Sequence, residues 1–240
     1  MRHKLRLRPK EQPYKLSTQK ILSKWFWCVI MGEMYGDANE TRYATDIKDV
    51  VADIEGRENQ NRTINAAYFS ATRLISLQTR NSAAYKGIMA LVYREQCRDF
   101  MQGTTMDIVK NMDESPDIHH IFPESYCKKM GLNKNKWNSI VNKTPLLPAS
   151  NRQIGVEAPS AYSKKIIEMA EIDEEQLKSR VESHLINYNY FIVDDFYNYF
   201  IERAKAILKV IEVSMGKTIS DKDSEQTIEE FGCSLADDLN

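Results

Sequence analysis

Apolar residues recur every three or four positions between residues 195 and 215, and this is the clearest pattern in the chain. The repeat consists of Phe196, Phe200, Ala204, Ile207, Leu208 and Ile211. This spacing places an apolar stripe along one side of an α-helix, and Gly216 follows where such a helix would end. A stripe of this kind needs other elements to cover it, so we expect the chain to fold around helices.

Shorter patterns of the same type occur before residue 103 and after residue 163. We expect a first helix capped by Ser17 and a second helix that ends at Gly56. The inner face of the second helix is expected to carry Tyr43, Ile47, Val50, Val51 and Ile54. Further helices are expected over 64–78, 82–95 and 162–185.

The pattern changes between residues 104 and 159. Short segments over 104–109 and 118–122 are rich in β-branched or apolar residues, and a turn-rich connection separates them. We interpret these segments as two paired strands. Residues 123–159 are rich in Asn, Lys, Ser and Pro, and a long irregular stretch is tolerated mainly where it serves function. The expected fold class is therefore α+β, mostly α-helical, with a small finger inserted between helical segments.

Composition narrows the class of protein. Of the 240 residues, 42% are hydrophobic and 28% are charged, which is typical of a folded globular protein. The four cysteines form no C-x-x-C pair, which argues against a zinc knuckle or a disulfide framework and fits a reducing compartment. The longest apolar run, over 25–31, is too short to cross a bilayer. We expect a soluble cytoplasmic protein with no membrane contact.

The net charge of −1 hides an uneven distribution. Residues 1–24 are strongly basic and residues 218–240 are strongly acidic. Such asymmetry can mark an electrostatic binding surface, although two solvated ends without any partner explain it equally well. We interpret 1–16 as a basic connector and 218–240 as an acidic flexible tail.

Two adjacent histidines, His119 and His120, lie within the segment D-I-H-H-I-F-P over 117–123. Hydrolysis of a phosphodiester needs a base to deprotonate water and a cation to carry the charge that builds on phosphate. A neutral imidazole suits the first task, and an imidazole nitrogen also binds divalent metals. On a regular strand the two rings would point to opposite faces, which favours two roles over one two-histidine clamp. Pro123 is placed to end the strand. Ordinary polar strand residues remain the alternative interpretation.

The segment over 117–123, N-K-T over 142–144 and S-N-R-Q-I-G over 150–155 together resemble the H-N-H nucleases, also called His-Me finger or ββα-metal nucleases. The resemblance implies that His119 binds the metal and that His120 is the general base. It implies that Asn142 steadies the finger and that Asn151 is the second metal ligand. Arg152 would contact phosphate or stabilise the fold. One magnesium or manganese ion is the expected cofactor.

A narrower resemblance covers more of the chain. The form I-H-H-I-F-P, followed by N-R-x-I-G and A-P-S-x-Y, is similar to the C-terminal part of GmrSD-like type IV restriction endonucleases, which cut modified foreign DNA. K-W-F-W over 24–27, R-D-F over 98–100, and D-D-F over 194–196 with Arg203 are similar to their helical flanks. Such proteins normally begin with a nucleotide-dependent domain, but the chain has neither a D-G-Q-Q-R-like loop nor a G-x-x-x-x-G-K-[ST] loop. The resemblance therefore implies an upstream nucleotide-dependent domain or subunit.

These observations predict helical regions over 17–103 and 164–217, the second packing back on the first, and a nuclease finger over 104–163. The expected function is metal-dependent DNA endonuclease activity in a prokaryotic defence protein, and a homo-oligomer is possible because one site per chain cuts one strand at a time. Phosphate contacts are expected from nearby lysines: Lys128, Lys129, Lys134, Lys136 and Lys143. His184, on a helix beside apolar residues, is expected to be structural. The alternatives are a non-cleaving binding or regulatory module with an H-N-H-like fold, and an RNA-directed nuclease or toxin.

Overall fold

The computed structural model describes residues 16–36, 39–106 and 116–236, and within them the chain is mainly helical. The helices are α1 (Leu16–Met31), α2 (Asn39–Ile54), α3 (Arg62–Ala66), α4 (Arg73–Ser76), α5 (Ala83–Arg94), α6 (Glu124–Lys129), α7 (Lys134–Trp137), the 3-10 turn η1 (Ile140–Asn142), α8 (Pro148–Ile154), α9 (Pro159–Ala170), α10 (Glu174–Glu182), α11 (Tyr188–Phe191), α12 (Phe196–Met215) and α13 (Glu225–Phe231). Two strands, β1 (Asp117–His120) and β2 (Lys143–Leu146), form a small antiparallel sheet. The expected class, α+β and mostly helical, is confirmed.

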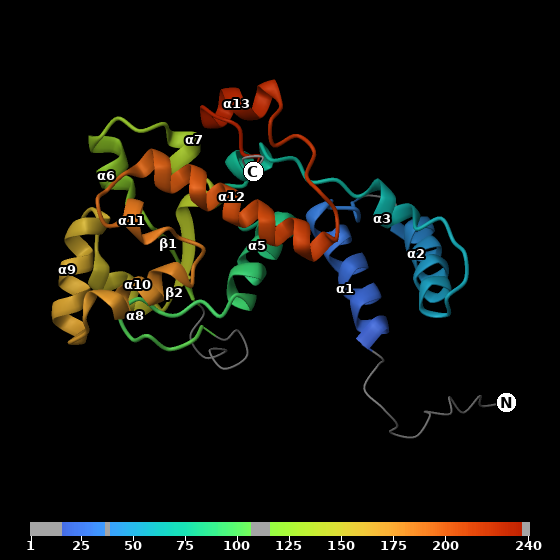
Figure 1. Cartoon of the computed structure of the whole chain (residues 1–240), viewed down its shortest axis with the longest axis horizontal. Helices are drawn as coiled ribbons and strands as arrows, with labels where there is room; N and C mark the ends of the chain where they lie inside the picture. Colours follow the sequence, from blue (N-terminus) through green and yellow to red (C-terminus); the bar gives the residue numbers. More distant parts are fainter. Residues whose placement is uncertain (1–15, 37–38, 107–115, 237–240) are drawn as a thin grey trace, which may run out of the picture.

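Helix α12 runs from the part of the molecule that contains the sheet as far as α1, and α2 and α3 lie beyond α1 (Figure 1). It packs against α11, η1 and α5, and its C-terminal part lies beside α1. The predicted apolar stripe is buried along the helix, and Gly216 takes the left-handed conformation (φ 59°) that ends it. The 195–215 prediction is therefore confirmed, and the stripe forms the centre of the main hydrophobic core.

Helix α2 is rotated relative to the sequence-based expectation. Its expected inner residues Tyr43, Ile47, Val51 and Ile54 are all exposed, while Asp46 and Asp49 are buried. Asp49 accepts three hydrogen bonds from Arg62, one of them from its backbone N–H, and Asp46 accepts one from the Tyr35 hydroxyl. The prediction of an apolar inner face was wrong, because these carboxylates attach the helix to its neighbours through hydrogen bonds.

The first four helices depart from their predicted boundaries in two places. Helix α1 already includes Ser17, so Ser17 is not its cap. The helix expected over 64–78 is divided into α3 and α4, because Lys217 and Asp221, which follow α12, bind backbone groups in the second half of α3 and between the two helices. The Lys217 ammonium donates to three carbonyls in this region, and Asp221 accepts from the Ala71 N–H. Helix α5, expected over 82–95, is found over Ala83–Arg94, and its cap is Ser82, which accepts from the Tyr85 N–H.

Strand β1 pairs with a segment that the sequence analysis assigned to irregular structure. His119 lies opposite Thr144, and His120 lies opposite Lys143. Over its described residues 104–106, the predicted partner forms an isolated bridge between Thr105 and Arg98; residues 107–109 lie outside the described part of the chain. The predicted pairing was therefore wrong over the described residues. The order along the chain is instead strand β1, a loop with two short α-helices and the 3-10 turn η1, strand β2 and then helix α8.

The acidic C-terminal segment is ordered over its described part. Helix α13 begins at its Ser224 cap, and Phe231 and Leu235 are buried against the core. The expectation of a flexible tail over 218–240 was wrong up to residue 236, because three apolar residues, Ile219, Phe231 and Leu235, attach an otherwise acidic stretch. None of the described helices is long and apolar enough to span a membrane.

Candidate active site

His119 and His120 line one pocket although they are adjacent on β1. The pocket has a volume of about 510 Å³ and is lined by Ile118, His119, His120, Pro123, Glu124, Ser125, Lys128, Asn151, Gly155 and Val156. Strand β1 ends at His120, and Pro123 precedes the first residue of α6, so the backbone turns directly after the pair. This is the early strand end that the sequence predicted from Pro123, and it allows both rings to reach the same hollow.

His119 meets Asn151 across the sheet-to-helix junction. The Nδ1 atom of His119 lies 2.8 Å from the Oδ1 atom of Asn151, although 32 residues separate them in sequence. Octahedral Mg²⁺ holds its ligands at about 2.0–2.1 Å, so two ligands at right angles lie about 3 Å apart. Because an amide oxygen only accepts, this contact is a hydrogen bond that the His119 Nδ1–H donates. The same separation fits two protein ligands on one divalent cation, which would take the place of that proton. Among the described residues, no three His, Cys, Asp or Glu side chains are grouped to hold a metal ion.

The His119 ring is 3% exposed and is enclosed by aromatic side chains. Phe100 and Tyr162 approach it edge to face, with ring centroids 6.4 and 5.9 Å away. This burial lowers the pKa of His119 to about 4, so the ring is neutral at pH 7. A neutral ring can offer Nδ1 to a cation only with its proton on Nε2, and Nε2 has no hydrogen-bond partner in the described structure.

His120 is partly exposed at the wall of the pocket and keeps only weak contacts. Its Nε2 atom lies 3.4 Å from the Asn138 Oδ1 atom, at the long end of a hydrogen bond. Burial and the neighbouring Lys143 lower the pKa of His120, so the imidazole is neutral at pH 7. A neutral imidazole beside a pocket, with no strong partner, is suited to accept a proton.

Asn142 is fully buried and fixes the backbone that follows the histidine pair. Its Oδ1 atom accepts from the Phe122 N–H at 2.9 Å. Its Nδ2 atom donates to the Phe122 and Trp137 carbonyls, both at 2.8 Å. The Asn142 carbonyl also accepts from the Ile121 N–H. Asn142 therefore joins the start of β2 to the end of β1, the steadying position that the resemblance implied, and it lies behind the pocket rather than in it.

Two residues on α12, Tyr199 and Arg203, bind the η1 turn and the start of β2, next to Asn142. The Tyr199 hydroxyl donates to the Val141 carbonyl at 3.0 Å. The fully buried Arg203 donates to the carbonyls of Val141 and Lys143, at 2.5 and 2.9 Å. From the sequence, Arg203 was expected only as part of a helical flank, and Tyr199 had no expected role. A charged residue inside an apolar helical stripe was the signal that could have identified this function.

Asp99 positions the helix that carries Asn151. The side chain is completely buried, and its carboxylate accepts from the Leu147 N–H at 3.0 Å and from the Ser150 hydroxyl at 2.6 Å. It also accepts from the backbone of its own turn at Met101 and Gln102. Asp99 thereby attaches the N-terminal end of α8 to the loop that contains Asp99, about fifty residues earlier in the chain. From the sequence, Asp99 was expected only as part of the R-D-F segment of a helical flank.

Of the residues expected to contact phosphate, Lys128 lies at the pocket, Arg152 is exposed and Lys143 is buried. Lys128 lines the pocket and pairs with Glu124 at 2.6 Å. Arg152 is exposed on α8, next to Asn151 in sequence. Lys143 is buried, and its ammonium donates to the Gln78 carbonyl at 2.6 Å, so it is not among the pocket residues. Burial lowers the pKa of Lys143 to about 8.

His184 is structural, as predicted. Its Nδ1 atom lies 2.6 Å from the Thr144 hydroxyl, and its Nε2 atom lies 2.8 Å from the Arg98 carbonyl. The ring therefore connects β2 to the turn that contains Asp99.

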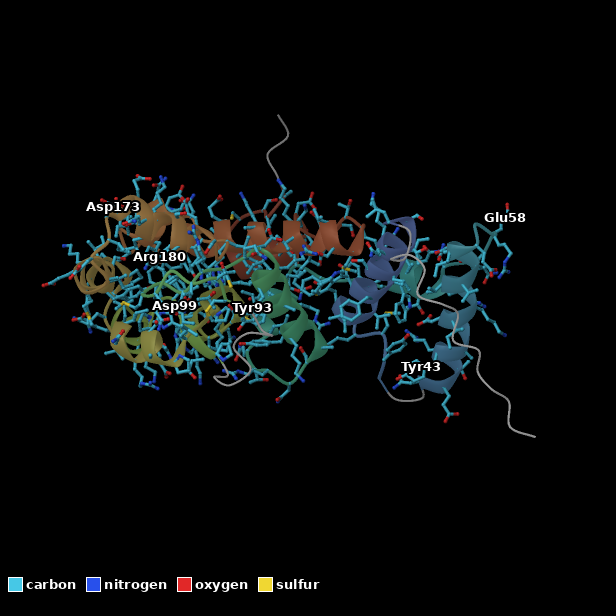
Figure 2. The ribbon with its side chains drawn as sticks, turned by 90° about the horizontal axis from the view of Figure 1, so that it is seen from below. Tyr43, Glu58, Tyr93, Asp99, Asp173 and Arg180 are labelled. Carbon is cyan, nitrogen blue, oxygen red and sulfur yellow. The ribbon has the colours of Figure 1, made fainter. Side chains whose placement is uncertain are left out.

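Figure 2 shows Asp99 well away from Tyr43, which lies on α2 at the opposite end of the molecule.

We expect acidification to destabilise the protein through His184. Burial lowers the pKa of His184 to about 3, so the folded chain stays unprotonated there while the unfolded chain takes up a proton below about pH 6.5. The free energy of unfolding that this histidine contributes is fully present above about pH 6.5. It decreases by about 1.4 kcal/mol for each pH unit below that value. Urea unfolding at pH 7, 6, 5 and 4.5 measures this slope. The slope should be smaller by that amount in His184→Gln, and an unchanged slope would show that His184 does not contribute.

Comparison with known proteins gives one relative without a known activity. The chain is 28% identical over 219 residues to the protein named "Uncharacterized protein MJ0686" from Methanocaldococcus jannaschii. The alignment covers 80% of this chain and 37% of the relative, so the chain spans little more than a third of that protein's length. No family model matches the chain. No solved structure matches it either.

Proposed function

We propose that this chain is a metal-dependent DNA endonuclease of the H-N-H type. The observation that carries the proposal is the 2.8 Å approach of His119 and Asn151, with the neutral His120 in the same pocket. The order strand, loop, strand, helix around these residues is also the order that a ββα-metal finger requires. No observation favours the non-cleaving module or the RNA nuclease over this activity.

Each side chain would have a separate task in hydrolysis. His120 accepts the proton of the attacking water, because its ring is neutral and faces the pocket. His119 and Asn151 hold one Mg²⁺ or Mn²⁺ ion, which when bound neutralises charge on the scissile phosphate and the leaving oxygen. Asn142 keeps the backbone after His120 in place through Phe122. Lys128, on the wall of the pocket, attracts the phosphate backbone.

The wider role follows from the resemblance to type IV restriction endonucleases. We propose that the chain is the nuclease part of a prokaryotic modification-dependent defence protein and works with a nucleotide-dependent domain or subunit. The greater length of the archaeal relative is compatible with this arrangement. Recognition of the modified base would then lie outside the pocket described above.

The direct test is cleavage of supercoiled plasmid DNA with Mg²⁺ or Mn²⁺. We expect nicked and linear products that disappear when EDTA is added. A matched reaction on single-stranded and double-stranded RNA of similar length addresses the RNA alternative. Cleavage that persists in EDTA would contradict the proposed chemistry, and binding without cleavage would support the non-cleaving module.

The pH dependence of cleavage provides a second measurement. His120 must be unprotonated to act as a base, and its pKa is lowered by burial and by Lys143. The rate should therefore rise with pH and level off, with the midpoint of the acid limb below about 6.5. Single-turnover rates between pH 4.5 and 8 give this midpoint. A midpoint above the ordinary histidine value would exclude His120 in this environment as the base.

A further inference from the structure

Asp117 occupies the position on β1 two residues before His119, and it contacts the same asparagine. Its Oδ2 atom accepts from the Asn151 Nδ2 atom at 3.2 Å. The other end of the same amide, the Asn151 Oδ1 atom, lies 2.8 Å from the His119 Nδ1 atom. Residues two apart on a strand lie on one face of the sheet, so Asp117 and His119 approach Asn151 from the same side. The amide is held between a carboxylate and an imidazole.

The two ends of an asparagine amide are chemically different. Only the oxygen can bind a cation, whereas the NH₂ group can only donate. A half-turn of the amide would therefore replace a ligand with a group that repels the ion. A carboxylate accepts hydrogen bonds and donates none, so Asp117 stabilises only the orientation with the NH₂ group toward itself. In that orientation the oxygen faces His119.

We propose that Asp117 is a positioning residue that keeps the Asn151 oxygen directed at the cation site. This inference rests on the proposed function, because it requires a cation between His119 and Asn151. Asp117 itself is not among the residues that line the pocket. Its role is therefore to orient a ligand, in the way that outer partners of metal ligands commonly do, where their loss weakens metal binding by about 10- to 100-fold.

The test is Mn²⁺ binding by isothermal titration calorimetry, without DNA, on the full chain. Asp117→Ala should weaken Mn²⁺ binding about 10-fold or more, because the amide loses the partner that selects its orientation. Asp117→Asn should stay within a few-fold of the unmodified protein, because its own carbonyl oxygen can still accept from Asn151. Thermal unfolding of each variant shows whether the fold is retained.

A second pair of variants separates orientation from simple attraction of the cation. In Asn151→Asp both side-chain oxygens can bind the metal, so orientation no longer matters, and Asp117→Ala then removes only the general attraction of a negative charge for the cation. Adding Asp117→Ala to Asn151→Asp should therefore weaken Mn²⁺ binding much less than it does beside asparagine. If Asp117→Ala weakens binding equally in both backgrounds, Asp117 attracts or binds the ion itself and the proposal is wrong.

The remaining outcomes distinguish failure of the positioning role of Asp117 from failure of the cation site itself. If the unmodified protein binds Mn²⁺ and Asp117→Ala binds it equally well, the positioning role is wrong and the cation site stands. If the unmodified protein binds no Mn²⁺, or if His119→Ala binds it as tightly, the cation site is wrong and the positioning role is wrong with it.

Discussion

Replacement of His120 by alanine is expected to reduce DNA cleavage by about 10²- to 10⁴-fold, the usual contribution of a general base. The imidazole is a neutral group on the wall of the pocket that can take a proton from water, and among the described residues its polar side-chain contact is the 3.4 Å approach to Asn138. Single-turnover nicking of plasmid DNA at saturating Mn²⁺ measures the loss at the chemical step.

The adjacent histidine offers a matched control for this experiment. His120→Ala should bind Mn²⁺ as the unmodified protein does, because His119 and Asn151 remain in place. His119→Ala should lose both cleavage and Mn²⁺ binding. Equal cleavage by His120→Ala and the unmodified protein would show that hydrolysis, if present, does not use this site.

Replacement of Asn142 by alanine should destabilise the fold by about 3 kcal/mol or more. The change removes three hydrogen bonds inside the protein and leaves the Phe122 N–H and the Trp137 carbonyl without their side-chain partner. A buried polar group left unpaired costs about 1–3 kcal/mol. For a chain of this size the loss corresponds to a fall of roughly 6–12 °C in Tm, which differential scanning calorimetry can measure.

A nearby asparagine in the same loop provides the comparison. Asn135 on α7 is exposed, so Asn135→Ala should change stability by no more than about 0.5 kcal/mol. Asn142→Ala should also cleave DNA poorly at temperatures where it stays folded, because the backbone after His120 loses its support. If the two variants have the same Tm, Asn142 does not hold the loop as the hydrogen bonds indicate.

The sequence predicted those elements whose own residues determine them. The stripe over 195–215 and the end of β1 before Pro123 are local properties, and both are present in the structure. The strand partner of β1 was not predictable in this way, because K-T-P-L over 143–146 contains a proline and has no alternating pattern. Its pairing is decided by tertiary contacts, including those that Tyr199 and Arg203 make with the adjoining turn.

Helix α2 shows a different limit of sequence reasoning. An apolar stripe at helical spacing normally marks the buried face, but in α2 the buried face carries Asp46 and Asp49. The partners that compensate these carboxylates, Tyr35 and Arg62, come from the segments before and after the helix. Periodicity alone contains no information about such partners, so it selected the wrong face.

For the candidate site, the residues that would touch the ion and the water could be proposed from the motif, while their supports could not. His119, His120 and Asn151 line one pocket, as the resemblance required. Asp99 acts through α8 from a loop about fifty residues earlier, and its contacts with Leu147 and Ser150 depend on the whole fold. Lys143 could not be recognised as buried, because its partner is a backbone carbonyl at Gln78.

The contacts made by Tyr199 and Arg203 limit how far the chain can be shortened at its C-terminal end. A fragment that ends before α12 would contain every residue of the pocket and would still lack the two side chains that anchor the Val141 turn. Such a fragment would be expected to expose apolar surface and to lose the alignment of its histidines. The shortest useful version of this chain therefore extends through α12.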